Sequence, residues 1–334
     1  FAFRSNGLMT RFIQINDCCV RQLAKVLSLL VPNYIHRLAI CMAKSKFSIY
    51  QIGDRGDLKI EEDNGRFEKY WISHPKLGRC LFKTASPIDS IPDQQQMDWR
   101  EKVACELGKS IGLPMAQTEF ASKSTSEKDA LISGSISVDY TPSGSQTMSL
   151  RGFLSQVDPN YDCAYSDSYE DGYSVKNVMH HLQQNSVGLP PSWEGIEGIN
   201  DGADLLVGYL LLDAWLGATD RHDENVEIAI SETGYTLCPS FDHGDCLGSK
   251  LPSEQQVSNF KDRRLSESCW WQTEEINGRL ETIEITTLEA FNNAYQIKPI
   301  AARSWQQRLV AVTSTQIQDI FARIPEGRIT AAAA

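Results

Sequence analysis

One stretch limits the fold of this chain more than any other: residues 203–216, Ala-Asp-Leu-Leu-Val-Gly-Tyr-Leu-Leu-Leu-Asp-Ala-Trp-Leu. Wound into a helix, it is apolar on almost every side. A helix of this kind has no face to offer to water, so it belongs inside the core of a large domain. Gly217 follows directly, at the position where helices commonly end. The sequence therefore predicts a buried central helix with other elements packed around it.

Size and charge narrow the class of protein. The chain has 334 residues, 41% of them hydrophobic, which suits one large or two modest domains. Its net charge of -11 argues against a general attraction to nucleic acid or to an anionic membrane. We expect protein or small-molecule partners instead.

The sequence also has no long apolar run and no cysteine motif of a known kind. No run approaches the roughly 20 apolar residues that a membrane span needs, so we expect no transmembrane helix. The nine cysteines include no C-x-x-C pair and no histidine at zinc-finger spacing. We interpret them as free thiols of a cytoplasmic protein.

The two ends of the chain differ from the rest. Residues 1–46 hold seven basic side chains against one acid, Asp17, a local charge of +6. Such a leader fits a targeting peptide, an amphipathic surface helix, or a disordered segment outside the folded domain, and we favour the last. At the other end, Ala331 to Ala334 stop within an expected helix start, so we expect the domain to be truncated there.

From Phe47 to residue 140 the pattern is that of an antiparallel sheet with one helix. Short apolar runs alternate with polar and glycine-containing turns, and residues 97–112 then change to helical spacing. The expected strands are residues 48–52, 70–72, 80–83, 116–121 and 131–140. We expect residues 47–140 to form an N-terminal lobe.

Residues 141–334 are expected to form a mostly helical second lobe. An irregular polar connector over 158–200 contains one helix at 175–184, and the buried helix comes next. From Gln255 to Ala322 the pattern is mainly helical, with helices at 304–312 and 315–324. The fold class is therefore α+β, with two lobes.

Directly after the buried helix comes a polar run, Thr219-Asp220-Arg221-His222-Asp223-Glu224-Asn225. Residues 226–230 and 235–238 then alternate like two strands around a turn. A short hairpin of this kind would return the next polar run, Ser240-Phe241-Asp242-His243-Gly244, to a place beside Asn225. Two oxygen ligands, from Asn225 and Asp242, could then face one magnesium ion.

An Asp, an Asn five residues later and a second Asp beyond a hairpin stand in the order that kinases use for a catalytic base and two metal ligands. Asp220 is the candidate base, and Asn225 and Asp242 are the candidate metal ligands. A loop that merely caps a helix could show the first spacing alone, but the buried helix and the returning Asp242 make that reading weaker.

The Thr219-Asp220-Arg221-His222 order, together with Asn225 and the Ser-Phe-Asp-His-Gly run, resembles the HipA-like kinases. These are relatives of bacterial toxin Ser/Thr kinases. The resemblance covers roughly residues 47–330. It implies a bilobal protein-kinase-like fold, the use of ATP and Mg2+, and phosphorylation of Ser or Thr on a protein substrate. It also implies an antitoxin-like partner.

A phosphate-binding lysine is expected near the end of the third strand. Lys83 stands there, ahead of the helix that carries Glu101 and Glu106, as the kinase lysine and its glutamate partner require. Glu101 lies in Trp99-Arg100-Glu101, which resembles the family's W-x-E pattern. We favour Glu101 as the partner of Lys83 and leave Glu106 open.

The remaining nucleotide contacts carry weaker signals. No G-x-G-x-x-G or Walker motif is present. Residues 64–69 could cover the phosphates with backbone N–H groups or with the charge of Lys69, although they also read as an ordinary hairpin turn. By analogy, adenine is placed against the backbone at Val138, Asp139 and Tyr140.

Three readings of function stay open beside a protein kinase: a small-molecule kinase, a lipid kinase, and a pseudokinase or toxin–antitoxin binding module. The presence of Lys83, Asp220, Asn225 and Asp242 together argues against a pseudokinase. Arg221 and His222 are expected to shape the loop. In the weaker reading of a loop that merely caps a helix, Asp223 and Glu224 add ordinary surface charge.

Overall fold

A computed structural model describes residues 45–53, 67–85, 97–124, 131–161, 173–249 and 267–329. Apart from Ser45 and Lys46, the basic leader lies outside these ranges, and so does the run Ala331 to Ala334. None of the helices within these ranges is long and apolar enough to cross a membrane.

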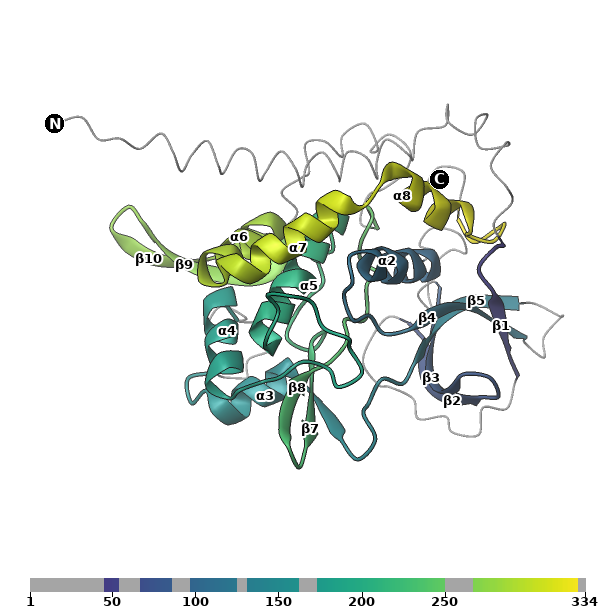
Figure 1. The fold of residues 1–334 in the computed structure, drawn as a ribbon, viewed down its shortest axis with the longest axis horizontal. Coiled ribbons are helices and arrows are strands. Elements are labelled where there is room, and N and C mark those ends of the chain that lie inside the picture. The colour runs from purple at the N-terminus through teal and green to yellow at the C-terminus, as the bar shows by residue number, and fades with distance from the viewer. Residues whose placement is uncertain are drawn as a thin grey trace.

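A five-stranded sheet and one helix form the N-terminal lobe (Figure 1). The strand order is β1 (Ile49–Ile52), β4 (Thr118–Ser124), β5 (Leu131–Val138), β3 (Gly78–Thr84) and β2 (Lys69–His74). Helix α2 (Asp98–Ser110) packs on β4 and β5. These elements match the strands and helix that the sequence predicted, although the boundary of the lobe at residue 140 stays a prediction.

One strand departs from the predicted antiparallel arrangement. Strand β1 runs parallel to β4, with Ile49 opposite Phe120, while the other neighbours are antiparallel. Only a tight turn forces adjacent strands to be antiparallel. Since β2, β3 and α2 separate β1 from β4 along the chain, no such turn acts on this pair.

The predicted buried helix is confirmed as α5 (Gly202–Leu216), the centre of the C-terminal lobe. The Asp201 side chain caps its start by accepting a hydrogen bond from the Asp204 N–H at 2.7 Å. Gly217 ends it with a φ of 63°, a left-handed conformation that glycine adopts without strain.

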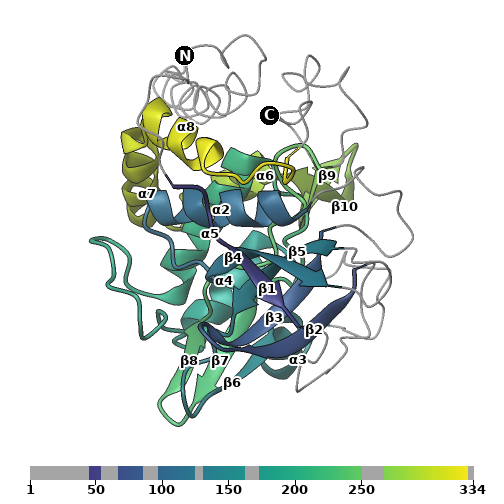
Figure 2. The ribbon, with the colours of Figure 1, turned by 90° about the vertical axis from the view of Figure 1, so that its right-hand side faces the viewer.

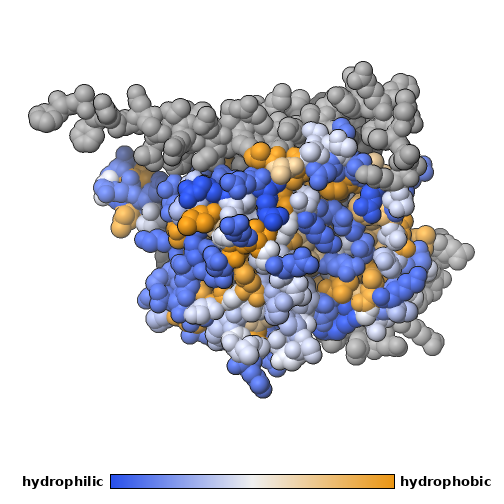
Figure 3. All heavy atoms as spheres, viewed as in Figure 1, coloured by the Kyte–Doolittle hydropathy of each residue, from blue (hydrophilic) through white to orange (hydrophobic). Residues whose placement is uncertain are grey.

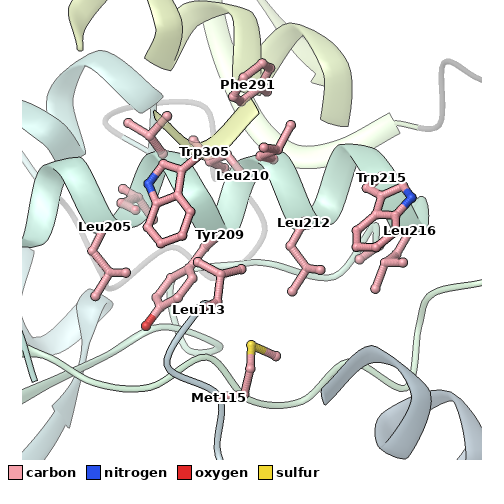
Figure 4. Close-up of a cluster of buried hydrophobic side chains, with 14 of the residues drawn as sticks. Leu113, Met115, Leu205, Tyr209, Leu210, Leu212, Trp215, Leu216, Phe291 and Trp305 are labelled. Carbon is pink, nitrogen blue, oxygen red and sulfur yellow. The ribbon is translucent and has the colours of Figure 1, made fainter. Parts of the chain in front are cut away.

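Helices α6 (Thr287–Ile297) and α7 (Pro299–Ala311) pack on α5, and α4 (Val175–Gln184) lies beside it. Figure 4 shows Phe291 above α5, while Leu205 and Tyr209 point down toward the segment that carries Met115. The Trp305 indole packs in the same core and donates a hydrogen bond to the Asp204 carbonyl at 3.0 Å.

A small sheet leads into the site. The predicted hairpin is present as β7 (Glu227–Ser231) and β8 (Gly234–Leu237), and β6 (Gln146–Ser149) pairs with β7. Helix α3 (Leu150–Val157) follows β6 directly, with the Ser149 side chain as its N-terminal cap. The sequence did not predict β6 or α3, since both are short.

The expectation of a mainly helical chain from Gln255 to Ala322 is wrong over residues 267–286. Strands β9 (Glu267–Ile276) and β10 (Arg279–Thr286) form an antiparallel hairpin that projects from the lobe (Figure 1). Its turn residues, Asn277 and Gly278, have φ of 54° and 80°. Asn-Gly between apolar runs is a hairpin signal, and it outweighs the helical pattern here.

After β10 the chain is helical as predicted, ending with α8 (Ser314–Ala322). Figures 1 and 2 both show α8 leaving α7 and lying across α2 of the other lobe. On the face drawn in Figure 3, hydrophilic side chains cover most of the described surface, and hydrophobic ones form smaller patches.

A substitution of Gly208 in α5 would test how tightly this core is packed. A Cβ there would lie 2.6 Å from Trp305 Cε2 and 2.7 Å from Leu113 Cδ2. We expect Gly208→Ala to lower the free energy of unfolding by about 1–3 kcal/mol, because the added methyl overpacks the core.

The matched control is Gly152→Ala in α3, where a Cβ meets no atom closer than 3.6 Å. There we expect no loss and up to about 1 kcal/mol of gain from helix propensity. Urea denaturation of both variants measures these changes. A loss of equal size at the two positions would contradict tight packing around Gly208.

Candidate active site

The two polar runs of the sequence line one pocket of about 230 Å³. Helix α5 delivers Asp220 at its C-terminal end, and the β7–β8 hairpin returns the chain to Asp242, as the sequence predicted. The lining residues are Asp213, Ala218, Asp220, Arg221, Asn225, Phe241, Asp242, His243 and Asp245.

Lys83 joins the two lobes at this pocket. Its ammonium nitrogen lies 3.1 Å from Glu101 Oε1 of α2 and 2.5 Å from Asp242 Oδ1 of the C-terminal lobe. The Lys83 side chain is only 12% exposed. The second oxygen of Glu101 accepts the backbone N–H of His243 at 2.8 Å. Glu101 therefore orients both the lysine and the segment that carries Asp242.

Glu106, the open alternative, has other partners. Its Oε1 lies 2.9 Å from Lys102 Nζ and 3.6 Å from Lys109 Nζ. In the structure Glu101 is thus the glutamate paired with Lys83.

The charged groups of this cluster shift one another's pKa values. Burial raises the pKa of Glu101 more than Lys83 lowers it, and the charge of Asp242 adds to the rise. Burial alone would lower the pKa of Lys83, but the carboxylates of Asp242 and Glu101 outweigh it, so the pKa lies above the usual range. Burial would likewise raise the pKa of Asp242, yet Lys83 and Lys69 hold it well below the usual range. Lys83 is therefore a cation and Asp242 an anion throughout the physiological pH range.

Asp242 itself stands in an unusual backbone conformation, with a φ of 52°. A non-glycine residue in this left-handed region is uncommon, although Asp tolerates it better than most. Just before it, the Ser240 N–H donates to the Pro114 carbonyl at 3.0 Å, and the Ala116 N–H donates to the Ser240 carbonyl at 2.9 Å. These two bonds fasten the Asp242 segment to the chain between α2 and β4.

Asp220 and Asn225 close the other side of the pocket. The Asn225 side-chain amide donates to the Asp220 carbonyl at 2.7 Å and lies 3.4 Å from Asp220 Oδ2. With its amide nitrogen turned to Asp220, Asn225 keeps its side-chain oxygen as an acceptor.

The donor atoms suit magnesium. Asp242 offers an anionic carboxylate and Asn225 an amide oxygen, both at the same pocket. Mg2+ prefers oxygen ligands and typically takes only one or two carboxylates, with water and phosphate completing its shell. Within the described residues, no group of three or more His, Cys, Asp or Glu side chains is placed to hold a metal ion.

Arg221 has the structural role that the sequence indicated. It is buried and forms a bidentate ion pair with Asp213 of α5, and its NH2 lies 3.4 Å from His243 Nε2. Since a guanidinium only donates, Nε2 of His243 is an acceptor and the ring proton sits on Nδ1. Burial, assisted by the Arg221 charge, lowers the pKa of His243 to about 3, so the ring is neutral.

Asp223 is not the surface charge that it would be in a loop that merely caps a helix. Its side chain is 2% exposed and accepts hydrogen bonds from Arg151 Nε at 3.0 Å and Arg151 NH2 at 2.9 Å. The Tyr161 hydroxyl donates to it as well. The partners lie 62 and 72 residues away in sequence, so no local pattern could reveal that Asp223 holds the Asp220 loop. Glu224 is largely exposed, although it too contacts Arg151.

Of the predicted phosphate-covering loop, residues 64–66 lie outside the described residues. Lys69 stands at the start of β2, directly opposite Lys83 in the β2–β3 register. Its Nζ lies 3.6 Å from Asp242 Oδ2. Two lysines from neighbouring strands therefore converge on one carboxylate.

The predicted adenine contacts at the backbone of Val138, Asp139 and Tyr140 stay a prediction, although two of the N–H groups already have partners. The Val138 N–H donates to the Gln117 carbonyl and the Asp139 N–H to the Arg79 carbonyl, each at 2.9 Å, so neither is available to a base in this arrangement. The Tyr140 ring lies against Phe241, with centroids 5.8 Å apart, and its hydroxyl donates to Glu227 at 2.8 Å.

Comparison with known proteins yields distant structural similarities. No protein-family model and no curated protein matches the sequence. The Helicobacter pylori proinflammatory kinase CtkA is 15% identical at a TM-score of 0.47, covering 83% of this chain and 95% of that one.

Two further structures have lower scores. The HipA, HipB and operator DNA complex of the Shewanella oneidensis MR-1 toxin–antitoxin system is 12% identical at a TM-score of 0.36, covering 86% of this chain and 67% of that one. The Golgi casein kinase with Mn/ADP bound is 12% identical at a TM-score of 0.31, covering 87% and 77%. Similarities this distant do not indicate an activity.

Neutral His243 gives the stability of the protein a definite pH dependence. In the unfolded chain a histidine takes up a proton near pH 6.5, whereas folded His243 does so only at about 3. The unfolded state therefore binds more protons between these values. The free energy of unfolding should fall as the pH drops from about 6.5 toward 3, by up to about 1.4 kcal/mol per pH unit.

His243→Gln keeps an acceptor for Ser240 and Arg221 but cannot titrate. Urea denaturation between pH 6.5 and 4 should show a smaller loss of stability in this variant than in wild type. Parallel pH profiles for the two proteins would mean that His243 takes up its proton at the same pH in the folded and the unfolded chain, and would contradict the lowered pKa.

Proposed function

We propose that this protein is an ATP- and Mg2+-dependent phosphotransferase that phosphorylates Ser or Thr of a protein, in the manner of the HipA-like kinases. The observation that carries this proposal is the meeting of Lys83, Glu101 and Asp242 from opposite lobes beside the Asp220–Asn225 loop. Phosphoryl transfer requires mainly positioning and charge, and this arrangement supplies both.

Asp220 is the proposed base. Its carboxylate lines the pocket, where it would orient an incoming hydroxyl and accept its proton as the bond to phosphorus forms. Asn225, which donates to the Asp220 carbonyl, would fix the loop, and the Arg151–Asp223 pair would hold it from behind.

Lys83 and Asp242 would exchange partners when substrate binds. Lys83 contacts Asp242 at 2.5 Å in the structure, and ATP phosphates would take the place of that carboxylate on the lysine. Asp242 and Asn225 would then hold Mg2+, which neutralises phosphate charge when bound. Glu101 would keep Lys83 oriented during the exchange, and Lys69 would add a second positive charge.

The pocket suits the phosphate end of the nucleotide. Its lining carries the polar side chains of Asp220, Asn225 and Asp242, and Phe241 lines it as well. The base would lie against the aromatic pair of Phe241 and Tyr140. Stacking on these rings would replace the contacts that the Val138 and Asp139 N–H groups cannot give.

A cytoplasmic location is part of the proposal. Five cysteines of the described chain are free thiols, which fits a reducing compartment. They are Cys80, Cys105, Cys238, Cys246 and Cys269.

Transfer of the γ-phosphate from ATP, followed by phosphosite mapping, tests the proposed activity. We expect wild-type protein to autophosphorylate on Ser or Thr in the presence of Mg2+. Asp220→Asn should lower kcat by about 10²- to 10⁴-fold, the usual contribution of a general base, with little change in KM for ATP.

Glu232→Gln, on the exposed turn between β7 and β8, is the matched control and should transfer phosphate like wild type. Equal kcat in wild type and Asp220→Asn would remove Asp220 from the reaction. Magnesium-dependent ATP binding without turnover would identify a binding module instead of an enzyme.

Two substitutions of Lys83 distinguish the contribution of its charge from that of its side-chain shape. Lys83→Met leaves the buried Glu101 without its cation and Asp242 with Lys69 alone, and we expect it to lower the free energy of unfolding by about 3–5 kcal/mol. Lys83→Arg keeps the charge and should stay folded but lose phosphate transfer, since the guanidinium places its donors differently. Thermal denaturation and the transfer assay measure the two effects. Full activity in Lys83→Arg would contradict a specific role for the lysine.

A further inference from the structure

The C-terminal end of the described chain returns to the N-terminal lobe. Helix α8 lies across α2 (Figures 1 and 2). The ring centroids of Phe321 in α8 and Trp99 in α2 are 6.4 Å apart. The Phe47 N–H, just before β1, donates to the Arg323 carbonyl at 2.8 Å. Residues 314–329, here called the C-terminal strap, therefore connect α7 with α2 and β1.

Arg328 is the polar anchor of the strap. It is only 5% exposed, and its NH1 donates to Asp98 Oδ2 at 2.6 Å. Its NH2 donates to the Ala121 carbonyl at 2.7 Å and to Ser122 Oγ at 2.6 Å. One buried guanidinium thus joins the first turn of α2 to β4.

Asp98 depends on this contact. It is 1% exposed, and a buried carboxylate without a cation is strongly destabilising. Its Oδ1 accepts the Trp99 N–H at 3.0 Å, but Arg328 is the cation bonded to its other oxygen. Without Arg328 the first turn of α2 would have to shift, or Asp98 would have to take up a proton.

Glu101 stands three residues after Asp98, on the same face of α2. A shift of the first turn would therefore carry Glu101 with it. Glu101 holds Lys83 at 3.1 Å and the His243 N–H at 2.8 Å, so both contacts depend on where the helix begins.

We propose that Arg328 is a positioning residue of the active site: by holding Asp98 it fixes α2, and by fixing α2 it keeps Glu101 on Lys83. Its effect on phosphate transfer rests on the proposed function. Its effect on the Lys83–Glu101 pair does not, because that pair is formed without nucleotide.

Arg328→Gln removes the charge, Arg328→Lys retains it, and Arg303→Gln, on the exposed face of α7, is the matched control. Hydrogen exchange of the full-length chain without nucleotide would compare α2 with α5. In Arg328→Gln we expect exchange to rise about tenfold or more in α2 and to stay unchanged in α5. A rise of equal size in both helices would indicate general destabilisation and overturn the proposal.

The second measurement is competitive acylation of lysines. If Glu101 leaves Lys83, the amine loses one of its two carboxylate partners and becomes more accessible to the reagent, so its labelling rate rises. Arg328→Gln should raise the rate at Lys83 but not at Lys298, whose ammonium lies 2.9 Å from Asp201 Oδ2 and 2.9 Å from Asp204 Oδ1 at the start of α5. The labelling rate of Lys83 in Arg328→Lys should lie closer to the wild-type rate, and in Arg303→Gln it should equal the wild-type rate. Unchanged labelling of Lys83 in Arg328→Gln would overturn the proposal.

Kinetics then connect the strap to catalysis. Arg328→Gln should lower kcat about 2- to 30-fold, the range for residues coupled to a site without touching it. If the wild-type protein transfers no phosphate, the proposed function is refuted. Hydrogen exchange in α2 and acylation of Lys83 would still decide whether Arg328 positions α2. Normal kcat with altered labelling would overturn the role of Arg328 in the reaction.

Discussion

The structure depends on one buried cation, the ammonium of Lys83, shared by two carboxylates from different lobes. Charges removed from water are tolerated only when they are paired, and loss of one partner leaves the others uncompensated. Neither lobe can therefore rearrange here without cost to the other. Glu101 extends the constraint through the His243 N–H, so strand β3, helix α2 and the Asp242 segment form one unit.

Backbone contacts outside the cluster make this arrangement possible. Ser240 exchanges hydrogen bonds with Pro114 and Ala116, which fixes the approach of Asp242 to the N-terminal lobe. Behind the pocket, Arg221 pairs with Asp213 of the buried helix α5, and Arg151 pairs with Asp223. The polar loop thus rests on buried ion pairs on both sides, and this support keeps a short, charged segment in one conformation.

Sequence patterns revealed what is encoded locally. The helix at 202–216 followed from its apolar composition, and the hairpin after it followed from alternation and a turn. The order of strand, helix and hairpin along the chain also indicated Lys83, Glu101 and Asp242 as candidate site residues. The contacts of Asp223 and Arg328 could not be predicted, because their partners lie 72 and 230 residues away. The β9–β10 hairpin was predicted as helix, although Asn277-Gly278 marked its turn.

The position of Arg328 also bears on the order in which the protein is made. Its partner Asp98 is synthesised 230 residues earlier, so helix α2 lacks its anchor until the strap has left the ribosome. Contacts over such separations form late, because a long loop of chain must close first. A nascent chain would therefore build its sheet and its buried helix first, and the proposed role of Arg328 would fix the Lys83–Glu101 pair only once residue 328 has left the ribosome.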